Sequence, residues 1–223
     1  MKKDSVFTKR IEIPHEKEIV RVIFVMFIYY FLLYVFDVTT KIPSLLWTNF
    51  ANVGLEILIT LPFFFIYLKW CPKEEKLDIK NKKQYRLVPV LIVVFLIQSI
   101  LEGYYYYGEF KLEFQMIKEG QVGWIIFYFF YYVFIIGIFE EFICRILIQN
   151  DLVTILGKAA FLAPLISAAF FGYMHMVQRD AICARSAFLF GLIIGYAKYY
   201  FKDCTFITIV LAHGLFDFIL SLL

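Results

Sequence analysis

The stretch Gly123–Ile148, GWIIFYFFYYVFIIGIFEEFICRILI, decides the fold class of the chain. This apolar run exceeds the roughly 20 residues that a helix needs to cross a bilayer. Glu140, Glu141 and Arg145 nevertheless lie within it. A charged side chain at bilayer depth costs at least about 2.5–3.5 kcal/mol on insertion scales. These three residues must therefore be compensated, and they indicate a functional site inside the membrane.

The composition of the whole chain agrees with this interpretation. Of its 223 residues, 62% are hydrophobic and 18% are charged, whereas soluble domains have about 45–50% apolar and about 25% charged residues. We therefore predict a multi-pass integral membrane protein whose surroundings are the lipid bilayer. The formal net charge of +3 comes from basic residues scattered among the expected loops, which argues against a nucleic-acid partner.

Hydropathy predicts an all-α fold, a polytopic membrane bundle of about seven helices forming one domain over residues 1–223. The expected helices are approximately Val22–Phe36, Phe50–Leu68, Leu87–Leu101, Gly123–Ile148, Pro164–Val177, Ala184–Phe201 and Thr205–Leu222. Pro164 favours a start of the fifth helix near Ala163, because proline suits the first turn. The stretch Leu152–Leu162 either begins that helix or forms a separate interfacial piece, and the aromatic connection Glu102–Gln121 is expected to lie in the membrane interface.

Basic residues predict the orientation of the bundle. The N-terminal arm, residues 1–21, and the connection after the second expected helix are rich in lysine and arginine. The positive-inside rule places both in the cytoplasm. Four widely spaced cysteines form no CxxC pair, and we interpret them as small buried apolar residues rather than as a disulfide framework. They are Cys71, Cys144, Cys183 and Cys204.

Charged and polar residues four positions apart share one helix face, and two such pairs occur near the end of the chain. Glu141 and Arg145 form the first pair and His213 and Asp217 the second. We expect the first pair to neutralise itself along one helix. Glu140, rotated by about 100° from its neighbour, then faces the bundle interior, where a carboxylate can act as a general base.

His175 near the end of the fifth expected helix completes the candidate site. If that helix begins near Ala163, then Glu140, His175, His213 and Asp217 fall within one layer of the membrane. Two histidines and two carboxylates could bind a divalent metal such as zinc. We expect that no metal is required, because the HExxH signature is absent and EExxxR contributes no histidine. If a metal is bound, these four residues would be its ligands.

Three motifs in this part of the chain together resemble the CPBP intramembrane proteases. EEFICR (Glu140–Arg145) fits EExxxR, FGYMH (Phe171–His175) fits FxxxH, and HGLFD (His213–Asp217) fits HxxxN/D. That family includes the type II CAAX prenyl endopeptidases and bacterial bacteriocin-immunity proteins. The resemblance covers residues 123–223 and makes them the expected catalytic core.

The resemblance implies a helix bundle around an intramembrane catalytic chamber. It implies that Glu140 activates a water, that His175 orients or deprotonates it, and that His213 and Asp217 stabilise the oxyanion. An ionised aspartate only accepts hydrogen bonds, so Asp217 could instead be protonated, orient His213 or bind a cation. We expect Glu141, Arg145 and Phe171 to support the site structurally.

We therefore expect an intramembrane endopeptidase that hydrolyses a membrane-associated peptide or protein. The short chain resembles bacterial members, so we expect it in a bacterial cell membrane. A non-catalytic membrane scaffold or bacteriocin-immunity protein of the same fold is the alternative. A transporter is a third possibility, because intramembrane glutamate and histidine also relay protons, but polar groups gathered in one layer do not form a path across.

Overall fold

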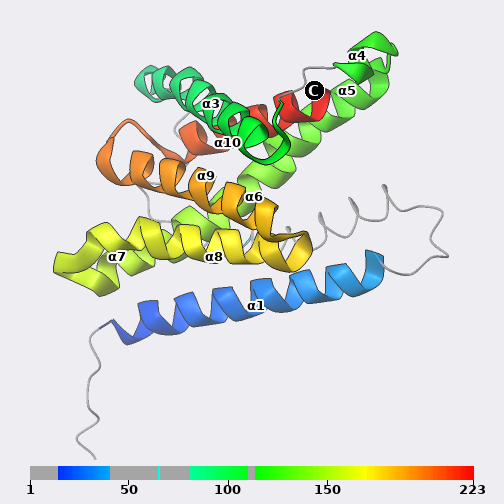
Figure 1. Cartoon of the computed structure of the whole chain (residues 1–223). Coiled ribbons are helices and arrows are strands. Elements are labelled where there is room, and N and C mark those ends of the chain that lie inside the picture. The colour runs from blue at the N-terminus through cyan, green and yellow to red at the C-terminus, as the bar shows by residue number, and fades with distance from the viewer. Residues whose placement is uncertain (1–14, 41–64, 66–80, 110–113) are drawn as a thin grey trace, which may run out of the picture.

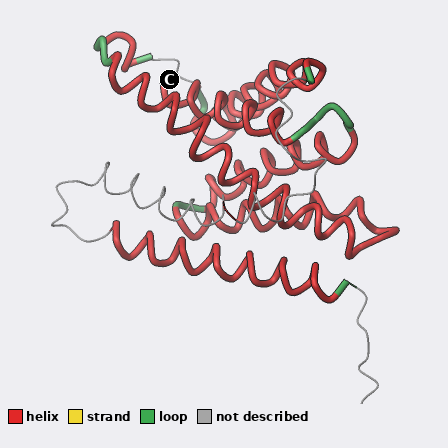
Figure 2. Tube along the Cα trace, turned by 180° about the vertical axis from the view of Figure 1, so that it is seen from behind, coloured by secondary structure: helices red, strands yellow, loops and turns green. Residues whose placement is uncertain are grey.

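Helices make up all the regular structure of the part of the chain that the computed structural model describes, which is residues 15–40, 65, 81–109 and 114–223 (Figures 1 and 2). The all-α bundle predicted from the composition is therefore confirmed. Three apolar helical stretches in this part are long enough to cross a membrane, and α10 is a shorter apolar helix. The long stretches are Lys82–Tyr107, Val122–Val177 and Ala181–Tyr200.

The expected helices that fall on described residues are recovered with shifted ends. Residues 22–36 lie within α1 (Glu16–Thr40), and the remaining long helices are α3 (Leu87–Tyr107), α8 (Ala163–Gln178), α9 (Ala181–Tyr200) and α10 (Phe206–Leu222). The second expected helix, Phe50–Leu68, lies outside the described residues except for Phe65, so the count of seven stays a prediction.

One connection has a different boundary from the one expected, and a second takes one of the two expected forms. The connection after residue 101 was expected in the membrane interface, but α3 continues through Tyr107 and ends where Gly108 adopts a left-handed conformation with φ of 72°. The short helix α4 (Gln115–Lys118) follows. Between residues 150 and 162, a short helix α7 (Asn150–Leu156) ends at Gly157, and a 3-10 segment leads to the start of α8 at Ala163.

The helix that carries the charged residues is built from four consecutive segments. It begins as α5 (Val122–Phe130), widens into a π-helical segment (Tyr131–Ile136), continues as α6 (Gly137–Glu141) and widens again over Phe142–Gln149. Each π turn inserts an extra residue and rotates the side chains that follow, and such turns are frequent at functional sites. Glu140 and Glu141 lie between the two widened segments.

Helices α8 and α9 form a tightly packed pair, because Gly172 leaves room for the facing backbone. A Cβ atom at Gly172 would lie 2.8 Å from the carbonyl oxygen of Ala184 and 2.8 Å from Cβ of Phe188. In Figure 1, α9 lies between α8 on one side and α3 with α10 on the other. The bundle core thus places α6, α8, α9 and α10 around the charged residues.

Helix α1 packs along α7 and α8 at the edge of the bundle (Figure 1). Near its start, the Arg21 guanidinium donates two hydrogen bonds to the two carboxylate oxygens of Asp151 in α7. Further along, Tyr29 packs its ring on Phe139 at 5.5 Å and on Phe170 at 5.9 Å between centroids. One ion pair and one aromatic cluster therefore fix α1 to the helices that carry the site.

The cysteines follow the prediction in part. Cys144 and Cys204 are buried and have free thiols, as expected. Cys183 is partly exposed, because it lies at the start of α9 where that helix borders a cavity. Cys71 lies outside the described residues.

Candidate active site

Glu141 is the centre of a buried charge network. Its Oε2 accepts a hydrogen bond from Arg145 Nε at 3.2 Å, and both side chains are fully buried. Its Oε1 lies 2.7 Å from Nδ1 of His213 in α10. A carboxylate paired with an arginine accepts only, so His213 Nδ1 carries the proton. The expected intrahelical pair is present, and the second partner in α10 is one that the sequence did not indicate.

Arg145 is held on its far side by α8. Its Nη1 donates to Ser167 Oγ at 2.9 Å, and Ser167 Oγ in turn donates to the carbonyl oxygen of Cys144 at 2.6 Å. The guanidinium also lies 5.7 Å from the centroid of the Phe171 ring. Arg145 thus links its own helix to α8 without facing the cavity that α8 borders, which fits a structural role.

The His213 ring is surrounded by carboxylates. Its Nε2 lies 3.3 Å from Asp217 Oδ2 and 3.6 Å from Glu140 Oε2, while Nδ1 donates to Glu141. A doubly protonated ring satisfies this arrangement, because both nitrogens of the imidazolium donate. Phe190 packs against the ring at 4.5 Å between centroids and shields it from one side.

A close crossing of two helices allows His213 to reach Glu141. A Cβ atom at Gly214 would lie 2.5 Å from Cα of Val133 and 2.7 Å from the carbonyl oxygen of Tyr132. At the facing position, a Cβ at Gly137 would lie 3.0 Å from the carbonyl oxygen of Val210. The absence of both side chains brings the α10 backbone against the widened helix directly beside His213.

His175 is oriented by its own helix. Its Nδ1 lies 3.0 Å from the carbonyl oxygen of Phe171, one turn earlier. A carbonyl oxygen only accepts, so Nδ1 donates and Nε2 is left as the nitrogen available to a ligand. The Phe171 ring contacts the imidazole with a centroid distance of 4.5 Å. Phe171 therefore positions His175 through both its backbone and its ring.

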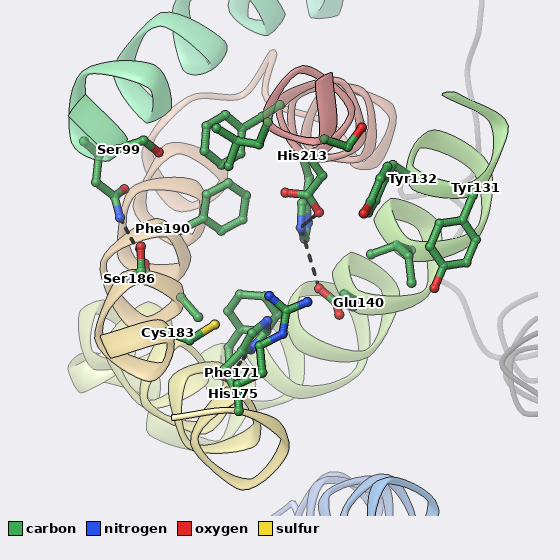
Figure 3. A pocket seen from close by; sticks show the side chains of 18 residues that line it. Ser99, Tyr131, Tyr132, Glu140, Phe171, His175, Cys183, Ser186, Phe190 and His213 are labelled. Carbon is green, nitrogen blue, oxygen red and sulfur yellow. Dashed lines mark hydrogen bonds and ion pairs between the residues drawn. The ribbon is translucent and has the colours of Figure 1, made fainter. Parts of the chain in front are cut away.

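The four expected site residues line one cavity of about 540 Å³ (Figure 3). Glu140 comes from α6, His175 from α8, and His213 and Asp217 from α10. In Figure 3, His213 and Glu140 point toward each other, and His175 lies beside Phe171 on the α8 side. The side chains of Glu140 and Asp217 are 14% and 25% exposed, so a molecule in the cavity can reach both carboxylates.

Several lining residues were not among the expected site residues. They are Gln98, Ser99, Tyr131, Tyr132, Ile136, Arg179, Cys183, Ser186, Ala187, Phe190, Phe216, Leu220 and Ser221. Arg179 follows His175 by four positions, a spacing that could have identified it from the sequence. Cys183, Ser99 and Ser186 lie on other helices, and only the packing of α3 and α9 brings them here.

The zinc alternative depends on how the histidine and carboxylate side chains are arranged. No group of three or more histidine, cysteine, aspartate or glutamate side chains there is arranged to hold a metal ion. Metal ligation uses a neutral imidazole nitrogen, whereas His213 donates from Nδ1 to Glu141 and turns Nε2 toward two carboxylates. With both nitrogens donating, His213 offers no lone pair to a metal, and whether the protein requires a metal stays a prediction.

In this apolar helix bundle, a glutamate and two histidines face one cavity. These are groups that acid–base hydrolysis uses. Residues 122–219 match a family described as type II CAAX prenyl endopeptidase, Rce1-like. The match runs from α5 into α10 and contains all three motifs, so the resemblance to the CPBP proteases is confirmed for this segment. Neither a curated protein nor a solved structure matches the chain.

The matched family is a family of proteases. Together with the three long apolar stretches, the match fits an integral membrane protein.

Proposed function

We propose that the protein is an intramembrane endopeptidase that hydrolyses a membrane-associated peptide or protein by attack of a water that Glu140 activates. One observation carries this proposal: Glu140 and His175 face the same cavity, while the adjacent Glu141 is neutralised behind its wall by Arg145 and His213. Two neighbouring glutamates thus have separate roles, one structural and one open to a substrate.

The proposed reaction begins with a water between Glu140 and His175. The Glu140 carboxylate takes a proton from this water, and the lone pair on His175 Nε2 accepts the second hydrogen as a hydrogen bond. The hydroxide attacks the peptide carbonyl carbon, and the carbonyl electron pair moves to oxygen. The carbon–nitrogen bond then breaks as Glu140 returns its proton to the leaving nitrogen. These steps need no metal.

His213 is proposed to stabilise the charge that develops on the carbonyl oxygen. Its ring is held by Glu141 at one nitrogen and lies near Asp217 at the other. We assign Asp217 the role of orienting and neutralising the His213 cation, since an ionised carboxylate cannot donate to an oxyanion. Preorganised donors of this kind contribute a large share of the catalysis in acyl transfer.

The test uses purified protein in detergent micelles with two internally quenched peptides, one carrying a farnesylated cysteine near its carboxyl terminus and one without the lipid. We expect cleavage of a peptide bond, identified by mass spectrometry. In Glu140→Gln, kcat should fall by about 10²–10⁴-fold, the usual contribution of general acid–base catalysis. Glu119→Gln is the matched control, because Glu119 is exposed and does not line the cavity.

The outcomes separate the candidates. A Glu140→Gln variant that cleaves as fast as the unmodified protein contradicts the assigned base. If the unmodified protein cleaves neither peptide nor a digest of membrane proteins, the non-catalytic scaffold becomes the better account.

A further inference from the structure

The cavity places two carboxylates close to where the reaction would create a further negative charge. Glu140 and Asp217 line it as carboxylates, and His213 directs its two nitrogens at carboxylate oxygens. An oxyanion formed here would lie near carboxylates, which accept hydrogen bonds. It would also lie near the His213 imidazolium, whose two nitrogens already face carboxylate oxygens. Efficient stabilisation requires a further donor, and a cationic donor is the most effective kind.

Arg179 is the one lining residue of this cavity with a permanent positive charge, among the residues that the structure describes. It follows His175 by one helical turn, and its backbone N–H donates to the His175 carbonyl oxygen at 2.9 Å. Cys183, at the start of α9, lines the same cavity. Arg179 thus lies at the end of α8, on the His175 side of the cavity.

A second cavity of about 580 Å³ adjoins the first and shares part of its wall. The residues lining both are Ser99, Arg179, Cys183, Ser186 and Leu220. The second cavity extends toward Tyr106 and Tyr107 at the end of α3. A peptide long enough to occupy both cavities would therefore pass Arg179, and its backbone carbonyl groups would come within reach of the guanidinium.

The other polar side chains of the cavity are weaker candidates. Ser186 Oγ donates to Glu102, Ser221 Oγ donates to the carbonyl oxygen of Phe218, and Gln98 Nε2 donates to the carbonyl oxygen of Ser186. The remaining hydroxyl groups, those of Ser99, Tyr131 and Tyr132, are neutral. Hydrogen bonds from a charged donor are roughly twice as strong as neutral ones.

We propose that Arg179 is a further catalytic residue, which donates to the oxyanion of the tetrahedral intermediate. This inference rests on the proposed peptidase function. When water adds to the carbonyl carbon, the carbonyl electron pair moves to oxygen, and Arg179 N–H groups hydrogen-bond to that oxygen. No bond to Arg179 forms or breaks. The electron pair returns to re-form the carbonyl as the carbon–nitrogen bond breaks.

The experiment measures kcat and KM separately for Arg179→Gln and Arg179→Lys with the quenched peptide that the unmodified protein cleaves. Arg179→Gln should lower kcat by about 10²–10³-fold with little change in KM, the effect of removing an oxyanion donor. Arg179→Lys should recover part of kcat, because lysine keeps the charge but loses the planar fork. Arg86→Gln is the matched control, because Arg86 is exposed and lines neither cavity.

Two results overturn the assignment while leaving the proposed function intact. One is an unchanged kcat in Arg179→Gln under conditions where Glu140→Gln is inactive. The other is a loss confined to KM, which would make Arg179 a substrate-binding residue only. If Arg179→Gln does not accumulate as folded protein, Arg179→Lys decides, and a kcat equal to that of the unmodified protein overturns the inference. Absence of any cleavage by the unmodified protein overturns both proposals.

Discussion

Replacing Gly214 by alanine tests how closely α10 must approach the helix that carries the two glutamates. The added Cβ would lie 2.5 Å from Cα of Val133. Carbon atoms in ordinary contact are about 3.5–4.0 Å apart, so the helices must separate by roughly 1 Å. The 2.7 Å hydrogen bond between His213 and Glu141 would then exceed the usual upper limit of about 3.2 Å.

Two losses follow from that separation. Overpacking of a helix crossing typically destabilises a protein by about 1–3 kcal/mol, and a hydrogen bond to a charged group contributes about 1.5–3 kcal/mol. The rate of peptide cleavage should fall about 10²-fold, since a misplacement near 1 Å in an active site has an effect of that size. Glu140 and His213 would no longer face each other at their present distance.

The assay combines SDS-titrated unfolding in mixed micelles with cleavage of the quenched peptide. Gly123→Ala is the matched control, because a Cβ atom there has nothing within 4 Å. We expect Gly123→Ala to match the unmodified protein in both measurements. If Gly214→Ala also matches it, the argument that this crossing positions His213 is refuted.

Three further sets of substitutions test contacts between helices by the same unfolding assay. Arg145→Met should destabilise the protein by about 3–5 kcal/mol, because it removes the arginine of a fully buried ion pair and leaves Glu141 with His213 alone. Combining it with Glu141→Gln should cost less than the sum, and strict additivity would argue against coupling. Ser167→Ala should cost about 1–3 kcal/mol by leaving a guanidinium donor unsatisfied, and a neutral effect would contradict that. Arg21→Gln and Asp151→Asn should show a coupling energy of about 1 kcal/mol in a double-mutant cycle, since this pair is only partly buried; zero coupling would mean that it does not hold α1.

The sequence predicted those features that depend on residues close together in the chain. Pro164 placed the start of α8 at Ala163, as observed, because proline at the first helical turn needs no hydrogen-bonded partner. The pair Glu141–Arg145 followed from spacing alone. By contrast, the end of α3 was placed too early, because the tyrosines at 104–107 were interpreted as an interfacial segment although they continue the helix.

The missed features depend on contacts between distant parts of the chain. The two π segments have no distinct residue pattern, and they rotate side chains by amounts that a regular helix does not predict. The bond from His213 to Glu141 joins residues far apart in sequence and requires the crossing at Gly214. Arg179 gains its place at the junction of two cavities only because α3 and α9 form the opposite wall.

The pairing of Glu141 with Arg145 has a consequence for how the protein is made. Synthesis proceeds from the N-terminus, so the helix with this pair leaves the ribosome before His213 has been added. Both charges can already meet at 3.2 Å within that one helix, so Glu141 and Arg145 can enter the bilayer as a neutral pair. The second partner of Glu141 is made only later, as part of α10, so the charge network can be completed only after α10 has joined the helices already in the membrane.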